Sequence, residues 1–224
     1  MQFRTAAERR EDLVALYREA SGCVRCPLHQ GRTNVVFGNG NADADLMFVG
    51  EAPGHHEDLQ GLPFVGRAGQ LLDQLLGEIG MSRKDVFVCN TLKCRPPGNR
   101  DPQPDGIDAC KPYLHRQVEL IEPKVICTLG NFATKLLTRS NRGITSVHGR
   151  PQVHEIGART VRVYPLYHPA AALRSTGTLA QLREDFARLA ALLEEPPPVP
   201  IGVVVPVAAS VAAEPEPSQM DLFG

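Results

Sequence analysis

Short apolar runs alternate with amphipathic segments along most of this 224-residue chain. Four of the runs lack the polar alternation of half-exposed strands and are typical of strands buried on both faces: residues 46–49, 86–89, 125–129 and 161–164. The clearest helical pattern between them places five apolar residues on one face: Leu71, Leu72, Leu75, Leu76 and Ile79. Such alternation favours parallel strands joined by right-handed crossovers. We therefore expect an α/β fold, a three-layer α/β/α sandwich around a mostly parallel four-stranded sheet.

The chain divides into two parts of different composition. Residues 1–195 carry the strand and helix patterns, from an N-terminal helix with Leu13 to a last helix that spans residues 179–193. Residues 196–224 are rich in proline and are expected to form a disordered tail. The net charge of −1 argues neither for nor against a nucleic-acid partner. The polar N-terminus and the lack of a long apolar run predict a cytoplasmic protein without a membrane segment.

Four of the six cysteines carry a strong chemical signal. Cys23 and Cys26 form a C-x-x-C pair, and Cys94 and Cys110 follow after longer intervals. In a reducing compartment, clustered cysteines are more often metal ligands than disulfides. The spacing leaves open an iron–sulfur cluster, a zinc site or purely structural cysteines. Two further cysteines lie inside predicted strands and are expected to be buried free thiols: Cys89 and Cys127.

Polar side chains follow three of the predicted strands at the point where each strand ends. Glu51 follows the first strand in a Gly-Glu-Ala-Pro-Gly turn, Asn90 follows the second, and His168 follows the last. Because ligands of parallel sheets bind beyond the carboxyl ends of the strands, we expect these side chains along one rim. Each has a structural explanation when taken alone, as part of a tight turn, as a cap or as a strand-end histidine. Their joint placement favours a functional site.

Four sequence blocks resemble the family 4, iron–sulfur uracil-DNA glycosylases: G-E-A-P-G-x-x-E-D, P-F-V-G-R-A-G-Q-L-L, N-T-L-K-C-R-P-P-G-N-R and Y-H-P-A-A-A-L-R. The resemblance extends from about Leu13 to Leu193. It implies a structural [4Fe–4S] cluster held by four cysteines: Cys23, Cys26, Cys94 and Cys110. The His-Pro motif continues with Ala170, where the wider superfamily often has serine. The chain also lacks the basic, histidine-bearing insertion of relatives that trap uracil-DNA covalently, so turnover is expected.

The resemblance implies a repair enzyme that flips uracil out of DNA and hydrolyses its N-glycosidic bond, which leaves an abasic site. Phe64 would stack on the flipped base. The Asn90 amide can accept from uracil N3–H and donate to O4, whereas cytosine reverses both groups. His168 would donate to O2, where the departing base gathers negative charge. Ala52, at the base site, occupies the position of a catalytic aspartate in another branch of the superfamily.

The catalytic carboxylate must therefore come from elsewhere. Glu51 is the first candidate for orienting the water and stabilising the sugar cation, and Glu57 is the second; the sequence does not rank them securely. By resemblance to superfamily members, Leu173 would enter the minor groove as a wedge and Arg174 would contact a phosphate. Further candidates for phosphate contacts are three arginines: Arg67, Arg95 and Arg100.

Uracil in single- or double-stranded DNA is the expected substrate, and the resemblance implies a nucleoid-associated monomer. Two other function classes stay open. One is a different enzyme of the same fold, which acts on other deaminated bases or traps uracil-DNA covalently. The other is a non-catalytic, cluster-containing DNA-binding module, which would need neither Asn90 nor His168 at the rim.

The last residues, Gln219-Met220-Asp221-Leu222-Phe223-Gly224, resemble a short bacterial motif that docks repair enzymes on the DNA sliding clamp. Three of them would make the contacts, with Leu222 and Phe223 as apolar anchors beside Gln219. Met220 stands where leucine is commoner, and its flexible side chain fits irregular apolar pockets. The alternative is an inert tail that matches by chance.

Overall fold

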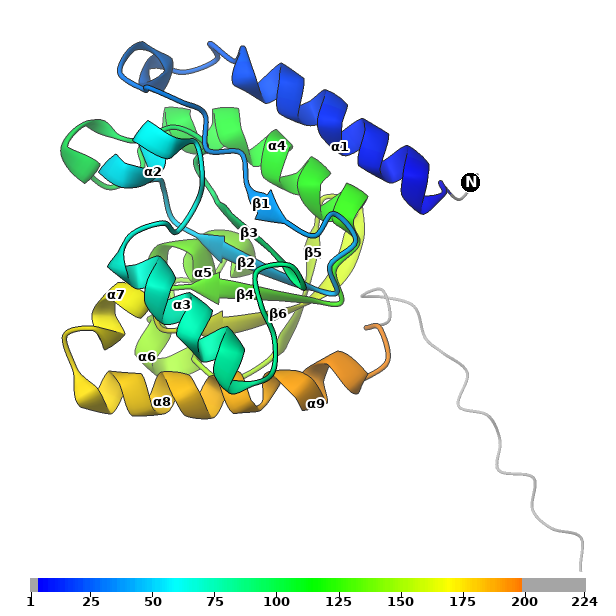
Figure 1. The fold of residues 1–224 in the computed structure, drawn as a ribbon, viewed down its shortest axis with the longest axis vertical. Coiled ribbons are helices and arrows are strands. Elements are labelled where there is room, and N and C mark those ends of the chain that lie inside the picture. Colours follow the sequence, from blue (N-terminus) through cyan, green and yellow to red (C-terminus); the bar gives the residue numbers. More distant parts are fainter. Residues whose placement is uncertain (1–3, 199–224) are drawn as a thin grey trace, which may run out of the picture.

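The protein, described here as a computed structural model of residues 4–198, is built around one six-stranded sheet with helices on both faces (Figure 1). The strand order is β1-β3-β2-β4-β6-β5. The four central strands run parallel and correspond to the four predicted runs: β3 (Val86–Asn90), β2 (Leu46–Gly50), β4 (Val125–Leu129) and β6 (Arg159–Leu166). The expected α/β class and the mostly parallel sheet are thus confirmed.

The expected number of four strands is wrong, because the sheet carries an additional strand at each edge. β1 (Asn39–Gly40) pairs antiparallel with β3, and β5 (Gln152–Ile156) pairs antiparallel with β6. β1 has only two residues, and most of β5 is exposed or half-buried. Neither strand therefore has the continuous apolar run by which a buried strand is recognised.

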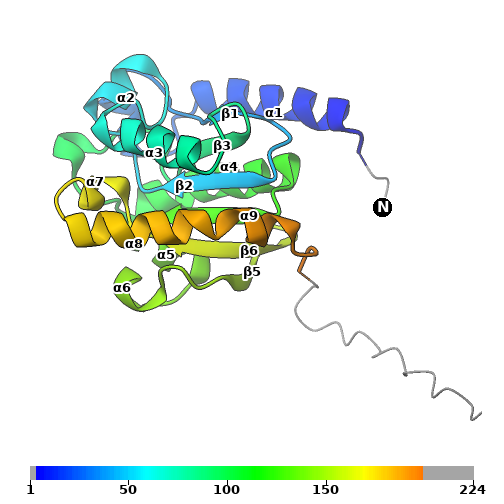
Figure 2. The same ribbon diagram turned by 60° about the horizontal axis from the view of Figure 1, so that its bottom comes forward.

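Each face of the sheet packs against its own helices (Figure 2). Three helices cover one face: α3 (Arg67–Glu78), α8 (Thr176–Ala187) and α9 (Leu189–Glu194). Three others cover the opposite face: α1 (Ala6–Ser21), α4 (Pro104–Ile121) and α5 (Asn131–Thr138). In β2, Phe48 faces the first group and Met47 the second. Successive strand side chains point to opposite faces, so both must be apolar for both layers to pack.

Local sequence signals account for several helix boundaries. α1 begins at a capping box, in which the Thr5 side chain accepts the Glu8 N–H and the Glu8 carboxylate accepts the Thr5 N–H. The leucines predicted to form one face of α3 are buried against the sheet. The predicted last helix is instead two helices, α8 and α9, which meet at Arg188.

The remaining helices are short: η1 (Pro27–Gln30), α2 (His55–Gln60), η2 (Pro97–Asn99), α6 (Ile144–Val147) and α7 (Pro169–Ala172). Because α2, η2 and α7 follow β2, β3 and β6, their loops gather at the carboxyl edge of the sheet (Figure 1). Within residues 4–198, no helix combines the length and apolar character needed to cross a membrane. The predicted clamp motif, with Gln219, Leu222 and Phe223, lies outside the described residues.

Candidate active site

The loops at the carboxyl ends of the parallel strands enclose a space of about 680 Å³, which we call the strand-end cavity. Its walls come from the residues after β2 and β3, the loop before α3, and the start of α7. The cavity brings together eight of the predicted site residues: Glu51, Ala52, Glu57, Phe64, Asn90, Arg100, His168 and Arg174. A concave site with several convergent polar groups can bind a small planar ligand such as a nucleobase.

Asn90, the last residue of β3, is only 2% exposed. No residue of the described chain hydrogen-bonds to its side-chain amide, so the amide donor and acceptor remain available to a ligand in the cavity. Gly50 pairs with Asn90 across the β2–β3 ladder. A Cβ atom on Gly50 would overlap the Asn90 amide oxygen and would stand 2.7 Å from the Phe64 ring. Glycine therefore allows an amide and an aromatic ring to approach the same point.

Phe64 is buried and has a left-handed backbone conformation, with φ of 55°. Arg83 Nη2 donates to the Phe64 carbonyl at 2.9 Å, and the helix position opposite that carbonyl is Gly69, where a Cβ atom would overlap it. The ring stacks on His168 with 5.7 Å between centroids. A non-glycine residue with positive φ costs conformational energy, and such strain is often retained at binding sites.

His168 is held as a neutral imidazole. Burial lowers the pKa of His168 to about 4, although the charge of Glu57 acts in the opposite direction. Its Nδ1 lies 3.1 Å from the backbone N–H of Ala170 and accepts that hydrogen bond. The ring proton must therefore be on Nε2, because a neutral imidazole carries one donor and one acceptor. The side chain can thus donate a hydrogen bond to a ligand without carrying a charge.

The two candidate carboxylates differ in what they contact. Glu57 Oε1 lies within reach of two backbone N–H groups of the Phe64 loop, at 3.2 Å from Val65 and 3.4 Å from Gly66. The Glu51 side chain has no hydrogen-bond partner among the described residues. Burial raises the pKa of Glu51, and the nearby charge of Asp101 raises it further. The geometry therefore gives Glu57 a tethering contact and leaves Glu51 open to the cavity.

The predicted DNA contacts occupy different positions around the cavity. Leu173 directly follows α7 and is 41% exposed, although it is a large apolar residue. Two of the arginines line the cavity: Arg100 and Arg174. Arg95 does not line the cavity, and its Nε donates to the Asn99 side chain at 2.7 Å. Arg67 is the exposed first residue of α3 and does not line the cavity.

Three of the four candidate ligand cysteines share one apolar cluster with Leu28 and Leu92: Cys26, Cys94 and Cys110. Cys23 lies between α1 and η1, at the margin of a neighbouring cluster. Two N–H groups point at these sulfurs: Arg32 Nη1 lies 3.4 Å from Cys94 Sγ, and the Lys93 backbone N–H donates to Cys110 Sγ at 3.4 Å. Hydrogen bonds to sulfur are typical of thiolates that bind metal.

Burial raises the pKa of Cys110 to about 11. In residues 4–198, no three His, Cys, Asp or Glu side chains are arranged around the position of a single metal ion. The two remaining cysteines, Cys89 in β3 and Cys127 in β4, are fully buried free thiols, as predicted. Burial raises the pKa of both, so neither is a reactive thiolate.

A buried lysine, which the sequence reasoning missed, connects the cysteine cluster to Asn90. Lys93 is 2% exposed, and its ammonium donates to the Asn90 carbonyl at 2.7 Å and to Gln117 Oε1 at 2.7 Å. Gln117 Nε2 in turn donates to the Phe37 carbonyl at 2.9 Å. No carboxylate in the described chain pairs with this cation. The only signal in the sequence is a lysine directly beside a candidate ligand, Cys94.

Comparison with known proteins places this site in a family. The sequence matches the uracil DNA glycosylase superfamily over residues 37–193. It is 46% identical over 191 residues to a type-4 uracil-DNA glycosylase of Sulfurisphaera tokodaii, covering 83% of this chain and 87% of the relative. A type-4 uracil-DNA glycosylase of Archaeoglobus fulgidus is 44% identical over 186 residues, covering 81% of this chain and 94% of that protein. The chain belongs to the type-4 uracil-DNA glycosylase family.

Family membership bears on the two parts of the site differently. Every residue that lines the strand-end cavity falls between Glu51 and Arg174, inside the segment that matches the superfamily. Cys94 and Cys110 also fall inside it, whereas Cys23 and Cys26 precede it. A type-5 uracil-DNA glycosylase of Pyrobaculum aerophilum is only 30% identical, over 169 residues that cover 68% of this chain and 74% of that protein. The type-4 assignment is therefore the better supported of the two.

Proposed function

We propose that this chain is a DNA repair enzyme that removes uracil from DNA by hydrolysing its N-glycosidic bond. The products are free uracil and an abasic site. The observation that carries the proposal is the meeting of an unpartnered amide, an aromatic ring and a neutral imidazole in one cavity: Asn90, Phe64 and His168. The names of the type-4 relatives point to the same reaction.

Recognition of uracil requires the base to leave the duplex, because its edges and its glycosidic bond are not accessible inside the stack. The Phe64 ring offers a stacking surface for the flipped base. The free Asn90 amide can accept from N3–H and donate to O4. Cytosine presents the reverse pattern and would leave both Asn90 groups unpaired, which is how a polar site rejects a base of similar shape. Ala52 contributes only a small wall to the cavity.

Bond cleavage develops negative charge on uracil and positive charge on the sugar. We assign His168 Nε2–H to uracil O2, where a fixed donor stabilises the leaving anion as the C1′–N1 bond breaks. A neutral imidazole suits this role, because it donates a hydrogen bond without needing to be protonated at neutral pH. Water then supplies the hydroxyl to C1′, and its proton passes to a carboxylate or to solvent.

Glu51 is the carboxylate that we assign to the water and to the sugar cation. Its side chain is free and lines the cavity, and its charge can stabilise the developing cation in a partly desolvated site. Glu57, whose Oε1 accepts from Val65 and Gly66, is assigned to holding the Phe64 loop. This division of roles predicts that replacing Glu51 affects the chemical step, whereas replacing Glu57 affects base binding.

Contacts to DNA are assigned to the rim. The exposed Leu173 is suited to enter the minor groove while the base is flipped, and Arg174 lies beside it to meet a phosphate. Arg100 is a further phosphate candidate from the opposite wall of the cavity. Arg67 and Arg95 remain weaker candidates, because neither lines the cavity and Arg95 is engaged with Asn99. The proposed substrates are uracil in single- and double-stranded DNA.

We also propose that a structural [4Fe–4S] cluster is held by four cysteines: Cys23, Cys26, Cys94 and Cys110. Their thiol donor set, their largely apolar surroundings and the N–H groups directed at two of the sulfurs support this assignment. In such a cluster each thiolate binds a different iron, so the four sulfurs need not surround one point. When bound, the cluster would cross-link the segment after α1, the loop after β3, and α4. No catalytic step is assigned to it.

The experiment that tests the glycosylase proposal uses uracil-containing oligonucleotides, both single-stranded and paired with guanine or adenine. Products are treated with alkali, which breaks the strand at abasic sites. Multiple-turnover strand breaks at uracil and none at cytosine support the proposal. A stable protein–DNA adduct indicates covalent trapping, and DNA binding without product indicates a non-catalytic module; either result overturns it.

The proposal extends to the location and partners of the enzyme. Action on chromosomal uracil requires access to DNA, in keeping with the expected cytoplasmic, nucleoid-associated location and a monomeric enzyme. The C-terminal motif, with Gln219, Leu222 and Phe223, is proposed to dock the enzyme on the bacterial sliding clamp. Tethering would raise the effective concentration of the catalytic part near newly replicated DNA.

A further inference from the structure

A second cavity, of about 380 Å³, lies between α4, α5 and β5 and is separate from the strand-end cavity. We call it the α4–α5 cleft. Three cationic side chains line it: Lys111 of α4, Lys135 of α5, and Arg139 at the end of α5. None of the three has an ion-pair or hydrogen-bond partner among residues 4–198. Unpaired cations around a concave surface provide a site for an anion.

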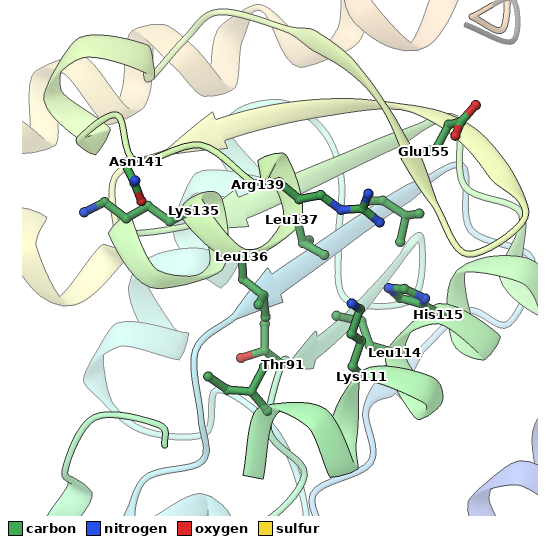
Figure 3. Close-up of a pocket in the computed structure, with 12 residues that line it drawn as sticks. Thr91, Lys111, Leu114, His115, Lys135, Leu136, Leu137, Arg139, Asn141 and Glu155 are labelled. Atoms are coloured by element: carbon green, nitrogen blue, oxygen red, sulfur yellow. The ribbon is translucent and has the colours of Figure 1, made fainter. Parts of the chain in front are cut away.

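The cationic side chains of the cleft come from two helices. Figure 3 shows Lys111 and His115 rising from α4 toward the guanidinium of Arg139, with Glu155 at the far edge of the view. Lys135 extends on the other side toward Asn141. Burial lowers the pKa of His115, and the positive charge of Lys111 acts in the same direction. His115 is therefore neutral at pH 7, and Glu155 is the one carboxylate in the lining.

The backbone at Arg139 is a second, independent observation. Arg139 caps α5 with φ of 51° and ψ of 32°, a left-handed conformation for which glycine is the usual residue. A long cationic side chain is thus retained at a position where it costs conformational energy. Residues in such conformations cluster at ligand-binding sites, where the strain has a use.

The α4–α5 cleft and the strand-end cavity share no lining residue, but a third space adjoins both. An intermediate space of about 550 Å³ shares Glu51, Asp101 and His168 with the strand-end cavity. The same space shares three other residues with the cleft: Ile107, Lys135 and Leu136. Glu51 and Asp101 lie at the end of this space next to the strand-end cavity, where their negative charges disfavour an anion. An anion is favoured only farther on, toward Lys135 and the cleft. From its first residue to Arg139, α5 spans about 12 Å, or about three to four nucleotide steps of a B-form strand.

We propose that the α4–α5 cleft binds a backbone phosphate of the DNA strand that carries the uracil, on one side of the flipped nucleotide. The inference rests on the proposed glycosylase function for the path of the strand. Lys111 and Arg139 contact the phosphate directly, and Lys135 guides the strand between the two cavities. Such contacts fix the register of the strand and carry no base preference.

The test uses a variant chosen to preserve the fold. In K111Q/R139G, glycine suits the left-handed backbone at residue 139 and glutamine keeps most of the side-chain length at residue 111, so both positive charges are removed without strain. The matched control is K84Q, which removes an exposed lysine that precedes β3 and does not line the cleft. Single-turnover rates are measured against enzyme concentration on single strands with uracil near the 5′ end, at the centre or near the 3′ end.

For K111Q/R139G we expect the half-saturating concentration to rise roughly tenfold on the central substrate, with an unchanged maximum rate. The slope of log affinity against log salt should become shallower by about 0.7 for each phosphate of a single strand that the variant no longer neutralises. Trimming one particular flank should remove the difference from wild type, and trimming the other should not. K84Q should match the wild type in every measurement.

Three results would overturn the proposal. In the first, the double variant matches K84Q. In the second, the double variant loses the same DNA affinity whichever flank is trimmed, as expected if its cations act only through a diffuse electrostatic field. In the third, inorganic phosphate stabilises the wild type but not the double variant against heat, while the two proteins have equal DNA affinity; the cleft then binds a free anion.

Binding of uracil-free strands, followed by fluorescence anisotropy, separates this proposal from the glycosylase assignment. If no uracil is released, the anisotropy comparison of the same variants still decides whether the cleft binds a strand.

Discussion

Two ionisable residues of the strand-end cavity have pKa values that burial shifts in opposite directions. Burial lowers the pKa of His168 to about 4 and raises that of Glu51, because in both cases it disfavours the charged form. At neutral pH the imidazole is uncharged. The carboxylate is charged only when the pH exceeds its raised pKa. The acid side of the pH–rate profile should therefore include the protonation of Glu51.

Removing the His168 side chain should test the leaving-group assignment. We expect His168→Ala to lower the single-turnover rate of uracil release by roughly 10²–10³, the scale of losing one donor at a developing anion. DNA affinity should change little, because the contact forms chiefly in the transition state. Ala170→Ser, which adds only a hydroxyl beside the imidazole, is the matched control. An unchanged rate in His168→Ala would refute the assigned role.

Burial is the larger cause of the raised pKa of Glu51, and the charge of Asp101 adds to it, so Asp101 should influence the pH dependence. In the proposed mechanism the reaction requires the Glu51 carboxylate, so activity is present above the pKa of Glu51 and lost as the pH falls through it. Asp101→Asn removes a charge that raises this pKa, so the acid limb should move to lower pH. Single-turnover rates between about pH 4 and pH 8 measure the shift, and Glu51→Gln should abolish the limb together with most of the rate. An acid limb in Asp101→Asn at the wild-type position would contradict this assignment.

At the scale of secondary-structure elements, the end of β3 is the best-anchored part of the site. The Lys93 ammonium connects the Asn90 carbonyl to Gln117 of α4, and Gln117 connects onward to Phe37. The backbone N–H of the same lysine donates to Cys110. One buried residue thus connects the cysteine cluster to Asn90, the residue proposed to read uracil. A polar network of this kind stabilises a unique arrangement only while all its members are paired.

Lys93→Met should destabilise the protein and misplace Asn90. The substitution leaves two buried acceptors unpaired, each at a cost of about 1–3 kcal/mol. We expect a lower free energy of unfolding in urea and a larger half-saturating DNA concentration. Lys84→Met is the control, since that lysine is exposed and outside the network. Absorbance of the bound cluster, measured in each preparation, separates the loss of this link from the loss of iron. Wild-type stability in Lys93→Met would show that the network is dispensable.

At the scale of the whole molecule, the proposed cluster would join parts of the chain that are far apart in sequence. Cys23 and Cys26 follow α1, Cys94 follows β3, and Cys110 lies within α4. Contacts between such distant segments are costly to form in the unfolded chain, so a metal that links them stabilises the fold. The cluster should therefore matter for folding more than for chemistry.

Protein purified without oxygen should be brown, with broad absorbance near ~400 nm from thiolate-bound iron. Cys94→Ala should give poorly soluble or destabilised protein, because ligand loss costs folding before it costs catalysis. Cys127→Ala is the control, since this buried thiol lies in β4 away from the cluster and its loss should leave iron content unchanged. Iron and zinc analysis decides between the metals, and colourless protein with stoichiometric zinc would exclude the cluster.

The C-terminal motif should act independently of catalysis. A labelled peptide of residues 214–224 should bind the purified sliding clamp of the same organism at micromolar affinity, and replacing Leu222 and Phe223 with alanine should abolish binding, because two apolar anchors are removed. A chain that ends at residue 213 should release uracil from short oligonucleotides at the wild-type rate. Equal binding by both peptides, or binding by neither, would exclude the clamp as a partner of this motif.

The sequence by itself determined the central strands and the three polar residues at their ends. Continuous apolar runs identify buried strands, and parallel strands bring their carboxyl ends to one edge, so Glu51, Asn90 and His168 had to lie together. The sequence blocks likewise identified the family. The edge strands β1 and β5 could not be predicted, because such strands depend on hydrogen bonds from a neighbour and need no apolar run of their own.

Only the tertiary structure decided how the site is held. The Glu57 carboxylate accepts from two backbone N–H groups of the Phe64 loop, whereas the Glu51 side chain has no such partner in the described residues. The two carboxylates differ only through the positions of those N–H groups, which the sequence does not reveal. The tertiary structure placed the Lys93 ammonium on Asn90, and it opened the α4–α5 cleft, whose cationic side chains come from two helices. Periodicity reports which face of an element is apolar, but it carries no information about which polar groups meet across elements. Contacts between polar groups on different elements follow from how the elements pack.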